Sequence, residues 1–194
     1  MRIRALTAGE QCRDWEWRTA ELLVESGVVL RGRFKLSSGK ISDIYIDARK
    51  LLGMPRYFHA IVSLLRETFL SHVDVDAIIG VATGGIAWAA ALGFTMEMPI
   101  GYVRPKAKEH GLGRVVEGVE PPARILLVDD VATTGGSLAS AVEALRREGF
   151  TVDSAIVIVD REEGAKSRLK ALDVELRSLT RLSCIRSFLS SQPP

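Results

Sequence analysis

One stretch of the chain limits its possible folds more than any other. Residues 125–137 read Ile-Leu-Leu-Val-Asp-Asp-Val-Ala-Thr-Thr-Gly-Gly-Ser. The first four residues are apolar on both faces of an extended chain, which is typical of a central parallel strand covered by helices on both sides. From Leu138 to Gly149, apolar residues recur at helical spacing, and the glycine is a typical helix end. The stretch therefore predicts a strand, a polar loop and a helix in direct succession.

The predicted loop has the chemistry of an anion site. Hydroxyl and glycine residues occupy the start of the helix: Thr133, Thr134, Gly135, Gly136 and Ser137. There, unpaired N–H groups and the helix dipole favour a phosphate, and the glycines let the backbone approach it. Asp129 and Asp130 would repel a phosphate, so they suit ribose hydroxyls or the coordination shell of Mg²⁺ instead. Together these residues predict a site for a ribose 5-phosphate.

Residue types exclude two other phosphate-binding loops. Gly80 to Gly85 have the glycine spacing of a P-loop, but Ile86 and Ala87 stand where Lys and Ser or Thr are needed. The chain also contains no Gly-x-Gly-x-x-Gly fingerprint of a dinucleotide site. The alternative for residues 125–137 is an ordinary turn with surface aspartates, which requires the whole string to coincide by chance.

Composition and charge set the protein class. A chain of 194 residues with 47% hydrophobic and 26% charged residues is typical of one α/β domain with a substantial core. A net charge of +2 gives no general reason to expect nucleic acid or a membrane as a partner. The first residues lack the apolar core of a secretory signal, and glycines interrupt the apolar stretch 77–94, so we expect no membrane span.

The two cysteines bear on whether the protein occupies an oxidising or a reducing compartment. Cys12 and Cys184 form no Cys-x-x-Cys pair, no metal-binding spacing and no disulfide framework. This spacing predicts two separate thiols that are buried or partly buried. It also predicts a reducing, cytoplasmic location for the protein.

Strand and helix patterns follow each other along the rest of the chain. Residues 7–10 resemble a capping box, which predicts a helix running to about residue 26. Residues 34–40 have hairpin character, residues 42–47 alternate like a half-buried strand, and residues 55–70 are helical in pattern. This region therefore predicts a helix, a hairpin and a second helix before the first buried strand.

Three apolar strands are predicted at residues 77–81, 125–128 and 154–159, each followed by a polar or glycine-bearing turn. Alternation of strand and helix implies a parallel sheet with right-handed crossovers. Because ligands bind outside the carboxyl ends of such strands, the turns 82–85, 129–137 and 160–164 are expected to share one rim.

Two further segments carry candidate anion-binding groups. Thr83 and Gly84 lie in a glycine turn that suits a second anion such as pyrophosphate, the alternative being a tight strand–helix connection. The segment 102–114 contains Arg104, Lys106, Lys108, His110 and Arg114 between glycines. A charge run of this kind is usually a solvated surface. Beside a pyrophosphate leaving group it would instead neutralise developing charge and exclude water.

Residues 125–137 resemble the phosphoribosyl pyrophosphate (PRPP) motif of type I phosphoribosyltransferases. Over almost its whole length the chain is similar to the orotate phosphoribosyltransferases. The matching blocks occur in order at residues 34–40 with 42–49, 80–85, 104–111, 129–137 and 159–164. Ala-Lys-Glu-His-Gly in the third block and Asp-Arg-Glu-Glu-Gly in the last are the most discriminating, because the PRPP motif is shared by the whole superfamily.

This resemblance implies an α/β fold of the type I phosphoribosyltransferases, with a central parallel sheet flanked by helices and a small hood built from N-terminal and C-terminal segments. It implies a single domain over residues 1–194. Within it, the N-terminal helix and hood lie at about 1–50, the PRPP-binding core at 73–165 and a mobile catalytic loop at 104–118. It also implies a homodimer in which the loop completes the neighbouring active site.

The implied reaction transfers the 5-phosphoribosyl group from PRPP to N1 of orotate, giving orotidine 5′-monophosphate and pyrophosphate in UMP biosynthesis. The resemblance assigns PRPP binding to Thr83, Gly84, Asp129, Asp130, Val131, Ala132, Thr133, Thr134, Gly135, Gly136 and Ser137. Arg104, Lys108 and His110 would be catalytic and would close over the pyrophosphate. Thr133 and Arg161 would bind orotate, and a bidentate arginine suits a carboxylate-bearing pyrimidine. The alternative for Arg161 is a surface ion pair with a neighbouring glutamate.

Mg²⁺ is the implied cofactor. It would be carried by PRPP and would contact Asp129 and Asp130 through water, with no direct protein ligand assigned. Cleavage of the anomeric C–O bond puts positive character on ribose and negative charge on pyrophosphate, so the metal and the loop cations would stabilise the transition state. The reaction needs no protein nucleophile.

The chain departs from the family pattern at two positions. Ser37 and Pro105 stand where many members have Lys, and Lys35, Lys40 or Lys106 are the candidate substitutes. Two other functions stay open at this point. A transferase for another nucleobase would share the PRPP motif, and a PRPP-sensing regulator would add a DNA-binding element, of which the residues before Phe34 show no helix-turn-helix.

Overall fold

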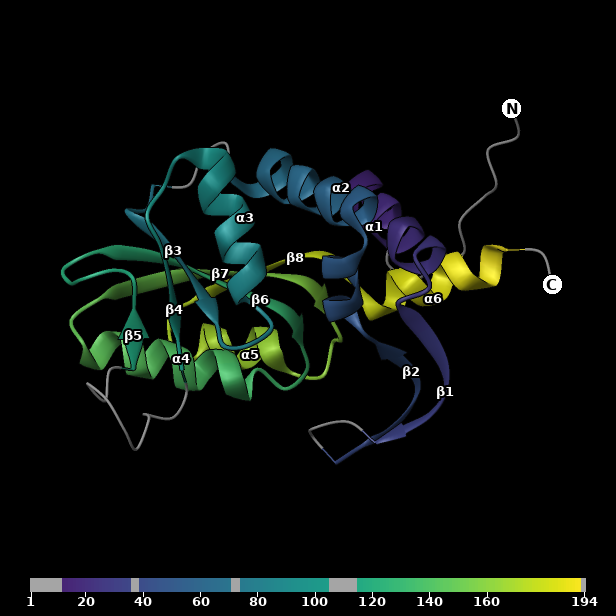
Figure 1. Ribbon diagram of the computed structural model, residues 1–194. Helices are drawn as coiled ribbons and strands as arrows, with labels where there is room; N and C mark the ends of the chain where they lie inside the picture. Colours follow the sequence, from purple (N-terminus) through teal and green to yellow (C-terminus); the bar gives the residue numbers. More distant parts are fainter. Residues whose placement is uncertain (1–11, 36–38, 71–73, 105–114, 193–194) are drawn as a thin grey trace.

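The computed structural model describes residues 12–35, 39–70, 74–104 and 115–192, and its centre is a six-stranded sheet (Figure 1). The strand order is β5-β4-β3-β6-β7-β8, with β5 antiparallel to β4 and the other neighbours parallel. The strands are β3 (Ala77–Val81), β4 (Ile100–Val103), β5 (Val116–Glu117), β6 (Arg124–Ala132), β7 (Thr151–Asp160) and β8 (Glu175–Arg181). The predicted central parallel sheet is confirmed.

Helices cover both faces of this sheet. In Figure 1, α3 and α2 lie on the upper face, and α4 and α5 lie on the lower face. The helices are α1 (Asp14–Glu25), α2 (Pro55–Leu65), α3 (Ile86–Met96), α4 (Gly136–Arg147), α5 (Ala165–Lys170) and α6 (Leu182–Ser191). A 3₁₀ helix, η1 (Ala48–Gly53), precedes α2, and a π-helical turn, η2 (Arg66–Leu70), follows it.

The hood is a small unit built from both ends of the chain. An antiparallel hairpin of β1 (Val29–Lys35) and β2 (Ile41–Ile46) stands beside α1 and α6 at one end of the sheet (Figure 1). α1 and α6 pack against each other and, with β8, connect the hood to the sheet. The predicted hairpin, the half-buried strand and the hood of N-terminal and C-terminal segments are therefore confirmed.

The core lies on both sides of the sheet because buried parallel strands are apolar on both faces. Side chains of successive strand residues point in opposite directions. Accordingly, Leu126 of β6 belongs to the hydrophobic cluster that contains Trp88 of α3, and the next residue, Leu127, belongs to the cluster that contains Leu138 of α4. All four side chains are at most 1% exposed, so β6 is the central strand that the sequence pattern predicts.

Two predicted boundaries are wrong. α1 begins at Asp14 rather than near Thr7, because a capping box forms at Arg13, whose backbone N–H donates to Glu16 Oε2 at 2.8 Å; residues 7–10 lie outside the described residues. β6 continues to Ala132 instead of stopping at Val128, because β7 pairs with it over its whole length. The structure adds β4, β5, β8 and α6, which the sequence analysis did not identify.

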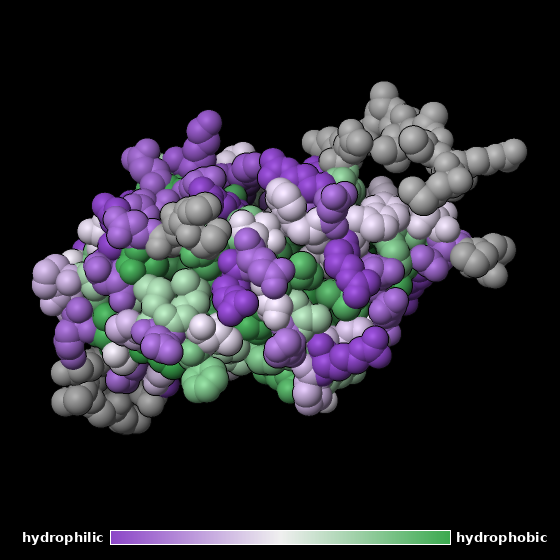
Figure 2. Space-filling model, turned by 90° about the horizontal axis from the view of Figure 1, so that it is seen from above, coloured by the Kyte–Doolittle hydropathy of each residue, from purple (hydrophilic) through white to green (hydrophobic). Residues whose placement is uncertain are grey.

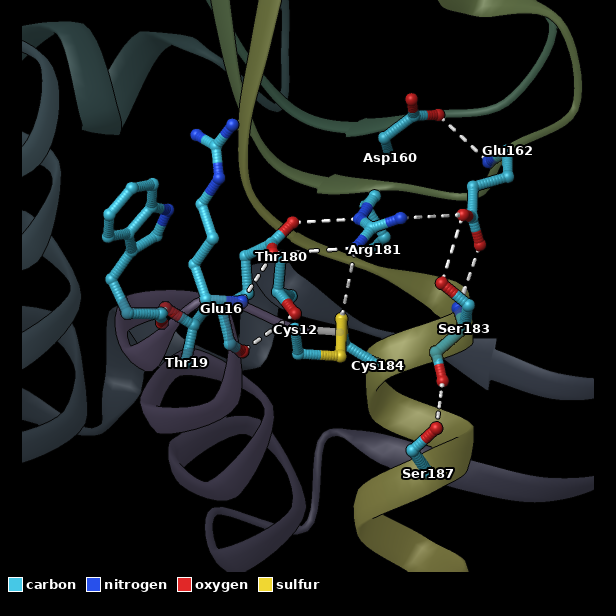
Figure 3. A network of polar contacts seen from close by, with 12 residues as sticks. Cys12, Glu16, Thr19, Asp160, Glu162, Thr180, Arg181, Ser183, Cys184 and Ser187 are labelled. Carbon is cyan, nitrogen blue, oxygen red and sulfur yellow. Dashed lines mark hydrogen bonds and ion pairs between the residues drawn. A yellow bond between two sulfur atoms is a disulfide. The ribbon is translucent and has the colours of Figure 1, made fainter. Parts of the chain in front are cut away.

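The predicted free thiols are also wrong, because Cys12 and Cys184 form a disulfide with a Cα–Cα distance of 5.9 Å (Figure 3). The pair is separated by 172 residues, and α1 and α6 bring its members together. Spacing along the sequence cannot show such a contact. With the cysteines paired, their spacing gives no indication of a reducing compartment. Among the described residues, no helix is long and apolar enough to cross a membrane.

Candidate active site

A pocket of about 640 Å³ opens where β3, β6 and β7 end. All three predicted turns reach it, and the hood closes one side. From the turns come Thr83, Gly84, Asp129, Asp130, Val131, Ala132, Thr133, Thr134, Gly135, Gly136, Ser137 and Arg161. From the hood and the segment after it come Lys35, Tyr45, Ile46, Ala48 and Arg49. The prediction that the turns share one rim is confirmed.

The glycine-rich loop leads into α4. Gly135 precedes the helix with φ 75°, a left-handed conformation that glycine adopts without strain. A Cβ at this position would also stand 2.9 Å from the Cα of Ala165, so a side chain here would force the backbone to shift. The N–H groups of Gly136 and Ser137 begin the helix and have no partner inside it. They line the pocket together with the hydroxyls of the loop, which is the arrangement that an anion needs.

The two aspartates lie inside β6 rather than after it. Asp129 pairs with Val157 of β7 and is 8% exposed. The backbone N–H of Asp130 donates to Asp129 Oδ1 at 2.9 Å, and that of Val131 donates to Asp130 Oδ1 at 2.7 Å. The carboxylates are therefore fixed next to each other in the pocket wall.

Burial dominates the charge state of this pair. It raises the pKa of Asp129 well above the ordinary value, and the neighbouring charge of Asp130 adds to the effect. Burial likewise raises the pKa of Asp130, and the hydrogen bond from the Val131 N–H and the positive charge of Arg49 partly oppose this rise. Buried carboxylates are stabilised by hydroxyl donors or by a cation. The pair can therefore hold ribose hydroxyls or a hydrated metal ion, as its residue types predict.

Arg161 is buried and joins β7 to the hood. Its side chain is 3% exposed, and Nε donates to Glu163 Oε1 at 2.8 Å. Nη1 donates to the carbonyl of Ile44 at 3.1 Å, and Nη2 donates to Ser42 Oγ at 3.0 Å. The ion pair that the sequence offered as an alternative is thus present with Glu163, but it is buried in the pocket wall rather than on the surface. A guanidinium has five N–H groups, so these contacts leave donors for a ligand.

The second glycine turn also lines the pocket. Thr83 and Gly84 line the pocket, and the backbone N–H of Ala82 donates to the carbonyl of Val103 at 2.9 Å. The peptide bond between Ala82 and Thr83 is cis. Gly84 lies against Asp130, so this turn is close to the aspartate pair.

Of the five cationic residues predicted in segment 102–114, the structure describes only Arg104. The Arg104 guanidinium donates to Tyr102 Oη at 3.0 Å and lies 5.1 Å from the ring centroid, and it is not among the residues that line the pocket. Lys106, Lys108, His110 and Arg114 lie outside the described residues, as do Ser37 and Pro105. Of the candidate substitutes for the missing lysines, Lys35 lines the pocket, and Lys40 is exposed and does not line it.

Four pocket residues of the block 42–49 were assigned no role from the sequence. They are Tyr45, Ile46, Ala48 and Arg49, and the resemblance singled out their block without assigning roles within it. An alternating strand that ends in Asp-Ala-Arg was the available signal. It could not show which face of the strand meets the pocket, because that depends on how the hairpin stands against the sheet.

Comparison with known proteins agrees with this geometry. The phosphoribosyl transferase domain family matches residues 49–180. An orotate phosphoribosyltransferase from Aeropyrum pernix is 47% identical over 169 residues, which are 86% of this chain and 90% of that protein. The chain belongs to the orotate phosphoribosyltransferase family. Another orotate phosphoribosyltransferase, from Pyrobaculum islandicum, is 45% identical over 84% of each chain.

Solved structures of orotate phosphoribosyltransferases share the fold. A crystal structure of the enzyme from Aeropyrum pernix superposes with a TM-score of 0.80 at 44% identity, covering 89% of this chain and 99% of that one. The Mycobacterium tuberculosis enzyme, solved in complex with PRPP, gives a TM-score of 0.70 at 28% identity over 89% and 99% of the two chains. The type I phosphoribosyltransferase fold expected from the resemblance is thus confirmed.

Proposed function

We propose that this chain transfers the 5-phosphoribosyl group of PRPP to N1 of orotate, giving orotidine 5′-monophosphate and pyrophosphate. The observation that carries the proposal is the position of Arg161, a buried cation in the wall of a pocket whose other walls hold an anion-binding loop and paired carboxylates. A sugar phosphate and an acidic pyrimidine need these groups side by side. Family membership supports the same reaction.

The roles divide along the pocket. Residues 133–137 bind the 5-phosphate, Asp129 and Asp130 bind the ribose hydroxyls, and Thr83 with Gly84 faces the pyrophosphate. Thr133 and Arg161 bind orotate, with N–H donors of Arg161 directed to its carboxylate. Arg104, Lys108 and His110 close over the pyrophosphate. Arg104 does not line the pocket of its own chain, which fits the proposed role at the neighbouring subunit's site.

Mg²⁺ is the proposed cofactor, and it supplies positive charge that stabilises the departing pyrophosphate. The described residues contain no cluster of three or more His, Cys, Asp or Glu that could hold a metal by themselves. This fits Mg²⁺, which keeps several waters and binds through one or two carboxylates plus substrate phosphates. Asp129 and Asp130 would hold it through water, and their buried, mutually repelling charges favour a cation nearby.

Bond cleavage leaves positive character on the anomeric carbon, so the protein contributes mainly by orientation and electrostatics. The aspartates orient the ribose through its hydroxyls, and the loop fixes its 5-phosphate. Arg161 holds the orotate ring so that N1 faces the anomeric carbon. Closure of segment 104–118 excludes water that would hydrolyse PRPP.

We further propose one domain over residues 1–194, with the hood at about 1–50, the PRPP-binding core at 73–165 and a homodimer in which segment 104–118 completes the neighbouring site. An apolar surface on α3 supports a dimer. Phe94 is 85% exposed, and Ile100, the first residue of β4, is 42% exposed. Figure 2 shows hydrophobic side chains gathered on the part of this face that α3 occupies. Large exposed apolar residues of this kind mark contact surfaces.

A spectrophotometric assay of orotate consumption with PRPP and Mg²⁺ tests the proposal. Orotate loss that requires both additions is expected, and adenine, hypoxanthine and uracil in place of orotate should give no comparable turnover. Equal or faster consumption of one of those bases would contradict orotate as the substrate. Omission of Mg²⁺, with chelator present, is the control for the metal.

A further inference from the structure

The turn that carries Arg161 is fastened to α6 by the next residue, Glu162 (Figure 3). The backbone N–H of Ser183 donates to Glu162 Oε2 at 2.8 Å, and the Ser183 hydroxyl donates to Glu162 Oε1 at 2.9 Å. Ser183 lies in the first turn of α6, where N–H groups have no partner inside the helix. The N-cap residue Arg181 makes no side-chain cap. Glu162 therefore caps α6 from another part of the chain.

The backbone of Glu162 is unusual for a residue with a side chain. Its φ is 61°, in the left-handed region that favours glycine, and its N–H donates to Asp160 Oδ1 at 2.8 Å. Glycine would adopt this conformation with less strain. The glutamate keeps the strained conformation, and its carboxylate makes the contacts to Ser183. The turn that places Arg161 is thus linked directly to this contact.

A second contact joins the same carboxylate to α1. Arg181 Nη1 lies 3.7 Å from Glu162 Oε1, and its Nε donates to Glu16 Oε1 at 2.7 Å. Glu16 is 9% exposed in its side chain, so this ion pair is well shielded from water. Arg181 also lies beside Cys184, which is disulfide-bonded to Cys12 (Figure 3). The two helices of the hood therefore meet at the turn through Glu162.

The Arg161 side chain contacts the other part of the hood, at Ser42 and Ile44 of β2. Both the backbone and the side chain of Arg161 are therefore held by hydrogen bonds. Its backbone N–H donates to the carbonyl of Ala132 at 2.9 Å, and its guanidinium is held by β2 and Glu163. A shift of the turn relative to the hood would change the direction of the guanidinium N–H groups that face the pocket.

We propose that Glu162 is a positioning residue that sets orotate affinity by holding the turn of Arg161 against the first turn of α6. The inference rests on the proposed contact between Arg161 and the orotate carboxylate. It assigns no contact between Glu162 and the substrate. The proposed PRPP contacts lie on the other walls of the pocket, so we expect the effect to be confined to orotate.

The test compares Glu162→Gly with Glu97→Gly. Both variants replace a glutamate in the left-handed conformation by glycine, and Glu97 has φ 53° at the end of α3, away from the pocket. Glu162→Gly should raise the KM for orotate about tenfold, the size of one lost charge-assisted contact. Its kcat and its KM for PRPP should stay within about twofold. Glu97→Gly should change none of the three constants beyond that range.

Two conservative variants keep the test decisive. Glu162→Gln retains one acceptor oxygen and should raise the KM for orotate about threefold, and Ser183→Ala, which removes one donor, should have a similar effect. Because both remove parts of one contact, their effects should not add in the double variant. A role confined to stability would lower the fraction of active enzyme, and hence kcat, at unchanged KM. Unchanged KM for orotate in Glu162→Gly and Glu162→Gln overturns the proposal.

Arg161→Ala separates this inference from the proposed function. If that variant binds orotate normally, the proposed role of Arg161 is wrong. The NMR signal of Arg161 Nε–H in Glu162→Gly then tests whether Glu162 fixes the position of the Arg161 side chain. Broadening of that signal in Glu162→Gly supports positioning, and an unchanged signal overturns it. If Arg161→Ala weakens orotate binding and Glu162→Gly does not, the proposed function stands and the positioning role is wrong.

Discussion

A side chain on residue 84 would collide with Asp130: an ideal Cβ on Gly84 would stand 2.7 Å from both carboxylate oxygens of Asp130. Gly84 follows β3 and Asp130 lies within β6, and both residues line the pocket. The turn of Gly84, which we propose faces the pyrophosphate, is therefore packed directly against Asp130, which we propose binds the ribose. The distance leaves no room for a methyl group unless Asp130 moves.

The Gly84→Ala variant should be impaired in PRPP use. Displacing Asp130 costs roughly 1 to 3 kcal/mol, which lowers kcat/KM for PRPP about 5- to 150-fold. Gly53→Ala is the matched control, because no heavy atom lies within 4 Å of a Cβ there. Steady-state kinetics with varied PRPP measure both variants. Equal activity of the two would show that Asp130 can move without loss.

Replacing both carboxylates should separate stability from activity. Asp129→Asn with Asp130→Asn should lower kcat/KM for PRPP at least ~10²-fold, about 3 kcal/mol at the transition state. Circular dichroism should show an intact fold. Near wild-type turnover would rule out the ribose role of the pair.

The same pair predicts a pH dependence of stability. The folded pKa of Asp129 lies above its ordinary value of 3.8, so the folded protein binds more protons than the unfolded chain between those two pKa values. The contribution of this residue to the free energy of unfolding therefore falls as pH rises through that window. Asp129→Asn removes the contribution and should raise the melting temperature of the ligand-free protein at neutral pH. A lower melting temperature would contradict the raised pKa.

Arg161→Ala should weaken orotate binding by roughly 2 to 4 kcal/mol, since a buried carboxylate loses its partner, with little change in PRPP binding. The variant also leaves Glu163 without its buried ion pair, so Arg161→Ala with Glu163→Gln is needed as a stability-matched form. Isothermal titration with each substrate distinguishes the outcomes. Equal losses for both ligands would indicate a structural role.

Complementation tests whether the site is shared between chains. Lys108→Ala and Asp129→Ala homodimers should each be nearly inactive, because every site lacks a loop cation or a ribose carboxylate. Co-refolding the two should restore about a quarter of wild-type activity, since random mixing makes about half the dimers hybrid and each hybrid has one intact site. Verified hybrids without restored activity would place Lys108 in its own subunit's site.

The Cys12–Cys184 disulfide should contribute strongly to stability. It closes a loop with a sequence separation of 172, for which the entropy of the unfolded chain predicts up to about 5 kcal/mol. Urea unfolding of Cys12→Ser with Cys184→Ser should show a loss of about 2 to 5 kcal/mol, and dithiothreitol should have the same effect on the wild type only. If neither experiment changes the free energy of unfolding, the disulfide does not restrict the unfolded chain enough to affect stability.

The sequence alone determined those structural elements that depend only on residues close together in the chain. An apolar strand followed by carboxylates, hydroxyls and glycines specifies a strand–loop–helix unit, because strand burial, helix dipole and left-handed glycine each act within a few residues. The order of such units also predicted the parallel sheet and the convergence of Thr83, Asp129 and Arg161 at one rim. These predictions needed no knowledge of how distant segments pack.

Only the tertiary structure decided the contacts between distant segments. The extension of β6 to Ala132 depends on pairing with β7, and the disulfide depends on α1 meeting α6. Arg161 is buried because β2, more than a hundred residues earlier, supplies Ser42 and Ile44 as acceptors. The sequence shows which groups each residue carries. Which of them meet is set by packing of the hood against the sheet, and that packing has no local signature in the chain.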